Sequence, residues 1–161
     1  MILDDAIVQF LTRTEPLFIH LAVSGAEHRP YSVRCFGVRT YEGIAHLSIY
    51  ILKSQTEKVL SYIREGNSTI TCLFTDGISN ESYQIKGTFL QSKQSEDEKD
   101  LEILKCYREG SLKMFPKMYT KFPLSIANCD RITYRVTDIF VHTPGPYAGR
   151  KYKKGESKRD S

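Results

Sequence analysis

Basic and hydroxyl side chains gather between Arg34 and Lys58, in an order that suits the binding of a phosphate. Arg34 and Arg39 are expected on one strand, which is followed by a tight turn, a second strand and a helix. The helix opens with four residues that carry hydrogen-bond donors: Lys53, Ser54, Gln55 and Thr56. Guanidinium groups, hydroxyls and the free N–H groups of a helix N-terminus are the donors that bind phosphate in proteins. The segment therefore predicts an anion site.

The length and composition predict one soluble, cytoplasmic domain. The chain has 161 residues, enough for one sizeable core without disulfides or structural metal ions. No stretch approaches the roughly 20 apolar residues of a membrane-spanning helix, and the first residues lack the basic and then apolar layout of a signal peptide. We therefore expect a cytoplasmic protein with no membrane partner.

The net charge of +4 comes entirely from the C-terminal end. Six of the 23 basic residues and two of the 19 acidic residues follow Gly149, so the preceding residues carry no net charge. A short run of Gly, Ser and Lys cannot bury enough apolar surface to order itself. We therefore divide the chain into a folded domain at residues 1–143 and a basic, partly disordered tail at residues 144–161, and expect no nucleic-acid partner.

The cysteines indicate neither a disulfide framework nor a metal site. The four of them are far apart in the sequence: Cys35, Cys72, Cys106 and Cys129. They form no C-x-x-C pair and have no histidine nearby at metal-ligand spacing. We expect reduced and mostly buried thiols, since free cysteine is among the most buried residue types.

Apolar patterning and turn residues predict a first helix followed by strands. The helix begins after Asp4 or Asp5 and ends before Pro16. Six strands are expected, at residues 17–24, 30–36, 44–52, 69–74, 82–89 and 131–142. Most of them are joined by short turns, which favours antiparallel pairing.

Two further helices carry capping signals at their starts. Ser54 with Glu57 predicts a capping box for a helix at roughly residues 55–65, and Ser95 with Glu98 predicts another for the next helix. The inward face of this next helix is expected to include Leu101, Leu104 and Tyr107.

The predicted elements indicate a mainly β fold, an antiparallel barrel with helices packed outside. Alternating strand and helix units are missing, which argues against a doubly wound sheet. The sequence also lacks the G-x-G-x-x-G, P-loop, G-x-S-x-G and H-E-x-x-H motifs. The common nucleotide-binding, hydrolase and metalloprotease signatures are therefore absent.

In the order of its elements and residues, the chain resembles the FMN-binding split barrels related to pyridoxamine 5'-phosphate oxidase. The resemblance covers roughly Leu17 to Val141 and rests on the hairpin with Gly25 and Pro30 and on the segments 34–39, 53–56 and 83–87. It implies a six-stranded antiparallel split barrel with outer helices. It also implies a homodimer that binds FMN in a groove at the subunit interface.

The same resemblance implies a set of cofactor-binding residues. The FMN phosphate is expected at Arg34, Arg39, Lys53, Ser54, Gln55 and Thr56. Tyr50, as an aromatic residue able to stack on a flavin ring, and Gln84 complete the set. No residue stands out as a general acid or base, so the catalytic residues stay unknown, and no metal ligands are expected.

The implied function is that of a flavoprotein, an oxidoreductase acting on an unknown small molecule. The chain differs from the oxidases of this family in having Gln55 and Thr56 where they carry Arg and Lys. It also has no Trp and no counterpart of their Arg- and Trp-rich C-terminal segment. We therefore expect an activity other than that of pyridoxamine 5'-phosphate oxidase itself.

Two other classes of function stay open. In a cofactor-free or haem-binding split barrel with a stress or sensor role, Gln55 and Thr56 reflect the loss of the phosphate site. In a nucleic-acid-binding barrel, the basic tail provides the contacts, and binding falls steeply with salt.

Overall fold

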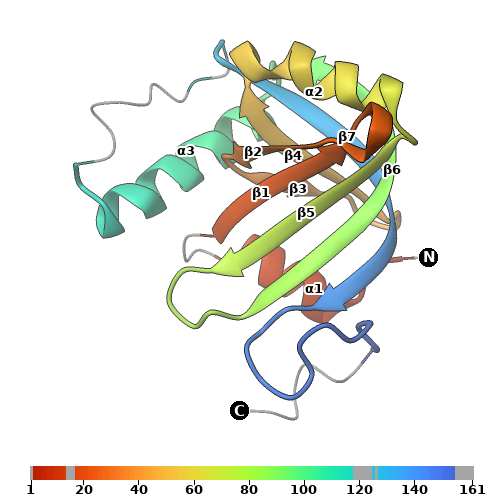
Figure 1. The fold of residues 1–161 in the computed structure, drawn as a ribbon. Helices are drawn as coiled ribbons and strands as arrows, with labels where there is room; N and C mark the ends of the chain where they lie inside the picture. The colour runs from red at the N-terminus through yellow and green to blue at the C-terminus, as the bar shows by residue number, and fades with distance from the viewer. Residues whose placement is uncertain (1, 14–16, 118–124, 126, 155–161) are drawn as a thin grey trace.

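The protein forms a strongly curled antiparallel sheet with helices around it (Figure 1). A computed structural model describes residues 2–13, 17–117, 125 and 127–154. The strands are β1 (Leu17–Ser24), β2 (Pro30–Cys35), β3 (Val38–Thr40), β4 (His46–Leu52), β5 (Thr69–Asp76), β6 (Ser82–Gln94) and β7 (Cys129–Val141). The helices are α1 (Asp5–Thr12), a short 3-10 turn at Ala26–His28, α2 (Lys53–Glu65) and α3 (Glu98–Met114). The mainly β fold with outer helices is confirmed, with seven described strands rather than six.

The sheet closes on itself where β2 gives way to β3. The strand order is β2-β1-β5-β6-β7-β4-β3, so β2 and β3 are its two edges although they are adjacent in sequence. At this corner the N–H of Phe36 donates to Tyr50 O at 2.8 Å, and the N–H of Tyr50 donates to Gly37 O at 3.3 Å. These bonds join the residues that follow β2 to β4. Because β4 also pairs with β3, the two edges of the sheet meet here.

Gly37 also separates the two arginines that we expected on one strand. Its φ is +143°, a conformation that side-chain-bearing residues rarely adopt, and a Cβ there would lie 2.7 Å from Ile103 Cγ2 of α3. The chain therefore bends at Gly37 and begins a new strand. The expectation of one strand is wrong, because Arg34 lies on β2 and Arg39 on β3.

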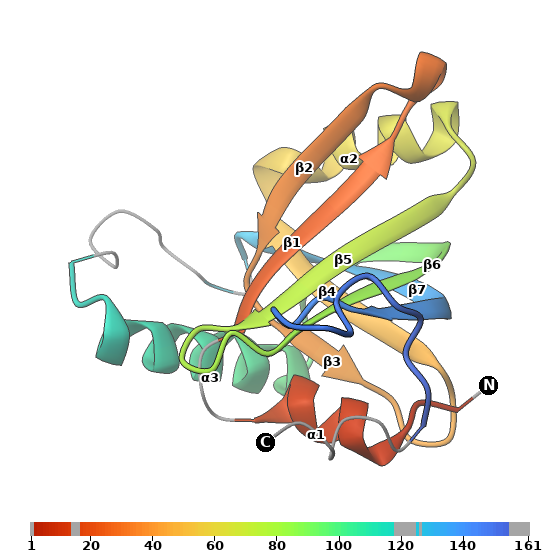
Figure 2. The same cartoon turned by 60° about the horizontal axis from the view of Figure 1, so that its bottom comes forward.

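The core lies inside the curled sheet and at its two ends. Alternate residues of β1 and β5 point inward, as the strand period requires. At one end α1 buries Ile7, Phe10 and Leu11, and at the other α2 buries Val59 and Ile63. Figure 2 shows these two helices at opposite ends of the barrel, with α3 beside it.

The helix starts agree with the sequence only for α1. Asp4 caps α1 by accepting from the N–H of Ala6, as expected. Helix α2 begins at Lys53 without a side-chain cap, so the capping box at Ser54 is wrong. Helix α3 is capped by Asp97 rather than Ser95, because β6 continues to Gln94 and the N–H of Ser95 still donates to Cys129 O on β7.

Helix α3 is only partly apolar on the side that faces the barrel. Leu104 is 2% exposed, as expected, whereas Leu101 is 50% exposed, so its expected inward orientation is wrong. Leu104 packs with Phe36, Tyr50 and Cys129. None of the described helices is long and apolar enough to cross a membrane.

The segment after β7 returns along that strand. The N–H of Gly149 donates to Val141 O, and the N–H of Tyr152 donates to Ile139 O, both at 2.7 Å. The Tyr152 hydroxyl donates to Asp4 at 2.8 Å, which connects this segment to the cap of α1. The expected helix stop at Pro16 and residues 155–161 of the expected tail at residues 144–161 lie outside the described residues.

Candidate functional site

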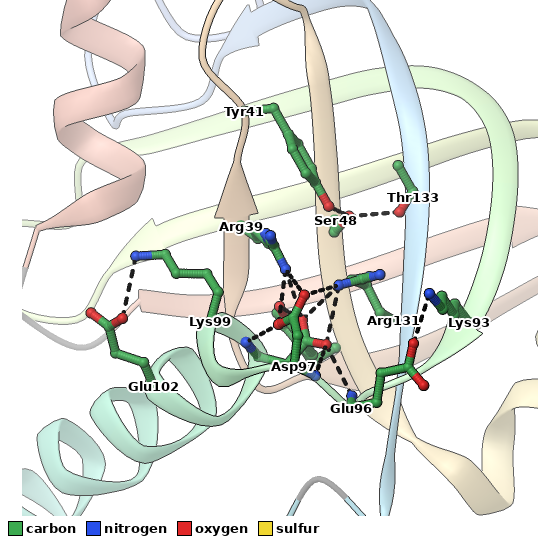
Figure 3. Close-up of polar contacts among 12 residues, drawn as sticks. Arg39, Tyr41, Ser48, Lys93, Glu96, Asp97, Lys99, Glu102, Arg131 and Thr133 are labelled. Carbon is green, nitrogen blue, oxygen red and sulfur yellow. Dashed lines mark hydrogen bonds and ion pairs between the residues drawn. The ribbon is translucent and has the colours of Figure 1, made fainter.

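Two arginines and two aspartates form a compact ionic cluster at the start of α3 (Figure 3). Arg39 comes from β3, Arg131 from β7, and Asp97 and Asp100 from the first turn of α3. Arg39 Nη1 lies 2.9 Å from Asp97 and 3.3 Å from Asp100. Arg131 Nη1 lies 3.4 Å from Asp97 and 2.9 Å from Asp100. We call these four residues the arginine–aspartate cluster, and their charges balance.

Asp100 is the buried centre of the arginine–aspartate cluster. Its side chain is fully buried and accepts from the Tyr50 hydroxyl, from Arg131 and from the N–H of Glu96. Burial alone would raise the pKa of Asp100, but these donors outweigh it and hold the pKa below its usual value. Asp100 is therefore an ionised, fully bonded structural carboxylate.

Asp97 is the exposed member of the same cluster. Its side chain is 45% exposed, against 0% for Asp100. The hydrogen bond from Arg39 is the main cause of a pKa well below the usual range, and the N–H of Asp100 adds to it. Asp97 therefore carries its negative charge throughout the ordinary pH range.

The expected site residues Arg39 and Tyr50 thus face α3. Tyr50 is completely buried, and burial together with its bond to Asp100 raises the pKa of its hydroxyl. Arg39 uses one nitrogen, Nη1, for all of its carboxylate contacts, while its guanidinium lies 5.2 Å from the Tyr41 ring centre.

Arg34 is in a different electrostatic situation. It is half-buried on β2, its guanidinium lies 5.7 Å from the Phe18 ring centre, and Nη2 is a long 3.5 Å from the Tyr107 hydroxyl. Its Nε is buried without a hydrogen-bond partner, and no ion pair joins it to a carboxylate of the described residues. Arg34 therefore has a positive charge that this part of the chain does not balance.

The structure does not bring Arg34 and Arg39 to one common group. Arg39 contacts Asp97, and Arg34 contacts Tyr107, ten residues further along α3. At a rise of 1.5 Å per residue, the two contacts originate about 15 Å apart on the helix axis. As placed, the two arginines are bonded to different parts of α3.

The start of α2 offers only part of the expected cradle. Lys53 and Ser54 are exposed and Gln55 is half-buried, so these side chains can reach a ligand. The N–H of Lys53 is already used, since it donates to Asn128 O at 2.7 Å. Thr56 is 8% exposed, and its hydroxyl lies 3.5 Å from Leu52 O of its own helix.

Gln84 lies on the same outer face of the sheet as Arg34. The register pairs Arg34 with His20, His20 with Leu73, and Leu73 with Gln84, and directly paired residues point to the same side. Three strand spacings separate the ends of this row, or about 14 Å. Only a ligand much longer than a phosphate could contact both Arg34 and Gln84.

Sequence reasoning did not identify Arg131 as a candidate site residue. Its side chain is 9% exposed, and its Nε is buried without a hydrogen-bond partner. The available signal was the adjacent charged pair Asp130-Arg131 near the start of the strand. Within the described residues, no three His, Cys, Asp or Glu side chains are grouped so that they could hold a metal ion. None of the expected site residues lines the small hollow formed by Ala26, Arg29, Ser61, Tyr62 and Glu65.

Comparisons with known proteins support the fold. No family model and no curated protein matches the sequence. HupZ of Group A Streptococcus has a TM-score of 0.54 at 14% identity, over 92% of this chain and 100% of that one. A Clostridium acetobutylicum protein related to general stress protein 26 of B. subtilis, of the pyridoxinephosphate oxidase family, has a TM-score of 0.54 at 10% identity, over 92% of each chain.

A third similar structure is a putative 5-nitroimidazole antibiotic resistance protein from Bacteroides thetaiotaomicron. Its TM-score is 0.50 at 15% identity, over 86% of this chain and 82% of that one. At such low identity a structural likeness establishes the architecture and leaves the activity undetermined. The chain therefore has the split-barrel fold of proteins related to pyridoxamine 5'-phosphate oxidase.

Proposed function

We propose that the protein binds FMN, with the phosphate at Arg34 and the flavin extending along the outer sheet face toward Gln84. The observation that carries this proposal is the half-buried Arg34 with its unpartnered Nε. A buried donor without an acceptor is costly, and an arginine beside aromatic rings suits a phosphate oxygen. The unbalanced charge of Arg34 therefore fits an anionic group.

The start of α2 supports the same placement of the phosphate. Helix α2 follows β4 directly, and the bond between Phe36 and Tyr50 O draws the end of β2 toward the end of β4. The exposed Lys53 and Ser54 therefore lie on the side of the barrel where β2 ends. A lysine and uncapped helix N–H groups stabilise an anion at such a position.

The remaining expected residues fit FMN unequally. Gln84 has an amide on the outer face that can hydrogen-bond a flavin ring. Arg39, as it stands, is balanced by Asp97 and Asp100, and Tyr50 is enclosed, so neither contributes to the proposed contact. Phosphate affinity then depends on Arg34 rather than on a pair of arginines.

In this proposal the protein is an oxidoreductase on a small molecule, and a second copy of the chain covers the outer face. Bound flavin would supply the hydride or electron transfer, and the chain would bind, orient and shield it. The half-exposed apolar residues of the outer row, Leu73 and Phe140, support a face that is covered in a homodimer.

Comparing FMN with riboflavin tests the proposal, because the two differ only in the phosphate. Flavin fluorescence is titrated with the wild type, Arg34→Ala and the exposed control Arg64→Ala. We expect the wild type and the control to bind FMN at least about tenfold tighter than riboflavin, and Arg34→Ala to lose this preference, as a charged hydrogen bond implies. Equal binding of both flavins to the wild type, or an unchanged preference in Arg34→Ala, would contradict the proposed site.

A cofactor-free split barrel is the second candidate, favoured by the arginine–aspartate cluster. The chain neutralises Arg39 internally and has Gln55 and Thr56 at the start of α2. In this case the protein quenches the fluorescence of neither FMN nor riboflavin, while its circular dichroism spectrum shows that it is folded. Haem binding and nucleic-acid binding stay predictions of the sequence, tested by a Soret band and by salt-dependent RNA binding.

A further inference from the structure

Arg39 and Arg131 converge on one exposed carboxylate. Asp97 accepts from Nη1 of Arg39 at 2.9 Å and from Nη1 of Arg131 at 3.4 Å. The two arginines come from β3 and β7, which both flank β4, so the sheet itself fixes their spacing. Two guanidinium groups held by a rigid sheet form a preorganised receptor for an oxyanion.

Asp97 is the part of the cluster that can leave. Asp100 is fully buried and held by Tyr50, Arg131 and backbone donors, whereas the side chain of Asp97 is 45% exposed. If Asp97 turned away, Arg39 would keep only one carboxylate contact, at 3.3 Å from Asp100. A carboxylate or phosphate from solution could then take the place of Asp97.

A second observation is that Arg131 has a donor that the described residues leave unused. Arg131 is more than nine-tenths buried, and its Nε has no hydrogen-bond partner. The exposed carboxylate of Asp97 contacts only Nη1 of Arg131. A carboxylate has two oxygens, whereas a phosphate monoester has three terminal oxygens and inorganic phosphate has four, so a phosphate can accept from more donors than Asp97 does.

Hydroxyl groups extend the receptor along the sheet. The register pairs Arg39 with Ser48 and Ser48 with Thr133, and Figure 3 shows the Tyr41, Ser48 and Thr133 hydroxyls as a chain above Arg39. The Tyr41 and Ser48 oxygens are 2.7 Å apart, and those of Ser48 and Thr133 are 2.6 Å apart. These hydroxyls can reorient to donate to a bound oxyanion, since a hydroxyl is both donor and acceptor.

We propose that Arg39 and Arg131 form a site for a carboxylate or phosphate group, and that Asp97 occupies this site as an internal competitor. The ligand binds when Asp97 releases the arginines. Because Arg39 holds the pKa of Asp97 far below its usual range, protonation at ordinary pH does not open the site. The site is separate from the Arg34 contact and does not depend on a flavin.

Asp97→Asn tests this proposal without removing the cap of α3. Asparagine caps helices as well as aspartate, but it carries no charge to compete for the arginines. The matched control is Glu98→Gln, which removes the adjacent exposed charge from the same helix turn. Binding of inorganic phosphate is measured by calorimetry at pH 7, and melting curves check that each variant is folded.

We expect Asp97→Asn to bind phosphate at least about fivefold tighter than the wild type and Glu98→Gln to change binding less than twofold, because only Asp97 contacts both guanidinium groups. The double variant Asp97→Asn with Arg39→Ala should lose the gain. If Asp97→Asn binds phosphate no better than Glu98→Gln, or if the double variant keeps the gain, the proposal is overturned.

FMN in the same series distinguishes the sources of the anion. A parallel gain for FMN over riboflavin in Asp97→Asn would add Arg39 to the flavin site. A gain for phosphate alone would indicate a separate site for an anionic small molecule. Both results support the internal competitor, and failure of FMN to bind any variant affects only the proposed flavin function.

Discussion

One nitrogen of Arg39 carries all of its carboxylate contacts, whereas Arg34 has no carboxylate contact among the described residues. This difference separates an arginine that a ligand can reach only when Asp97 releases it from one that no carboxylate of the described residues occupies. Removing Arg131 would leave Asp100 with a buried charge and fewer partners, which is among the more destabilising changes a protein can undergo. The arginine–aspartate cluster therefore contributes to the stability of the fold in addition to forming the proposed anion site.

The cysteines give a direct test of burial at the residue scale. Cys106 is exposed, and the other three thiols are buried, which confirms the expected mostly buried thiols. Burial raises the pKa of Cys72 to about 12 and that of Cys129 to about 11, and it raises the pKa of Cys35 as well. We expect a thiol reagent at pH 8 to label one cysteine in the folded protein and four in urea. Rapid labelling of two or more thiols in the folded protein would contradict the packing.

Among the secondary-structure elements, the pairing of β6 with β7 depends on the absence of a side chain at Gly87. A Cβ there would lie 2.1 Å from Arg135 O and 2.5 Å from Tyr134 Cδ2, next to a shift of strand register. Contacts with strand backbone cannot be relieved by a change of rotamer. The two longest strands therefore pack closely only because position 87 is glycine.

We expect Gly87→Ala to lower the free energy of unfolding by at least about 2 kcal/mol, since an added methyl must separate two paired strands. Urea denaturation measures this change. Thr88→Ala, at the next and half-exposed position, serves as the control and should cost less than about 1 kcal/mol. Equal urea midpoints for Gly87→Ala and Thr88→Ala would contradict this prediction, because they would show that β6 and β7 accommodate the added methyl without loss of stability.

The elements were predictable where local signals set their limits. The strand β1 and the cap of α1 follow from alternation and from Asp4, so the sequence located both. The three-residue β3 is too short to show alternation, and it exists because the bend at Gly37 returns the chain to β4. The caps of α2 and α3 were misplaced because β4 runs directly into α2, and β6 continues past its expected end.

The candidate site was less predictable than the elements. Arg34 and Arg39 could be chosen as anion-binding types, but their partners are 73 and 58 residues away in the sequence. Whether an arginine is balanced depends on such distant contacts. The sequence suggested that Tyr50 stacks on a flavin ring. Its hydroxyl instead donates to the buried Asp100 of α3, and sequence patterning predicts a helix without showing which strand residues it contacts.

The two ends of the described chain are tied together at the scale of the whole molecule. Tyr152 packs edge-on against Tyr83 at a ring-centre distance of 5.8 Å, and Tyr83 in turn packs against Phe10 of α1. The Tyr152 hydroxyl donates to Asp4, the cap of the same helix. The returning C-terminal segment therefore stabilises the end of the barrel that α1 covers.

We expect Tyr152→Ala to destabilise the protein by about 2 kcal/mol, through the loss of aromatic packing and of the bond to Asp4. Limited proteolysis should then cleave near α1 at least several-fold faster than in the wild type. Tyr147→Ala, at a position 39% exposed, is the matched control and should behave as the wild type does. Unchanged protection of α1 in Tyr152→Ala would mean that the segment contributes little to this end of the barrel.

The position of β7 in the sheet has a consequence for biosynthesis. This strand is the last of the described strands along the chain, yet it lies between β6 and β4 and pairs with both along most of its length. A nascent chain that has not yet released residues 129–141 from the ribosome has β4 unpaired on one side, and its apolar residues exposed. We infer that the barrel closes only after β7 has left the ribosome, and that a chain truncated before β7 would be prone to aggregation and to degradation.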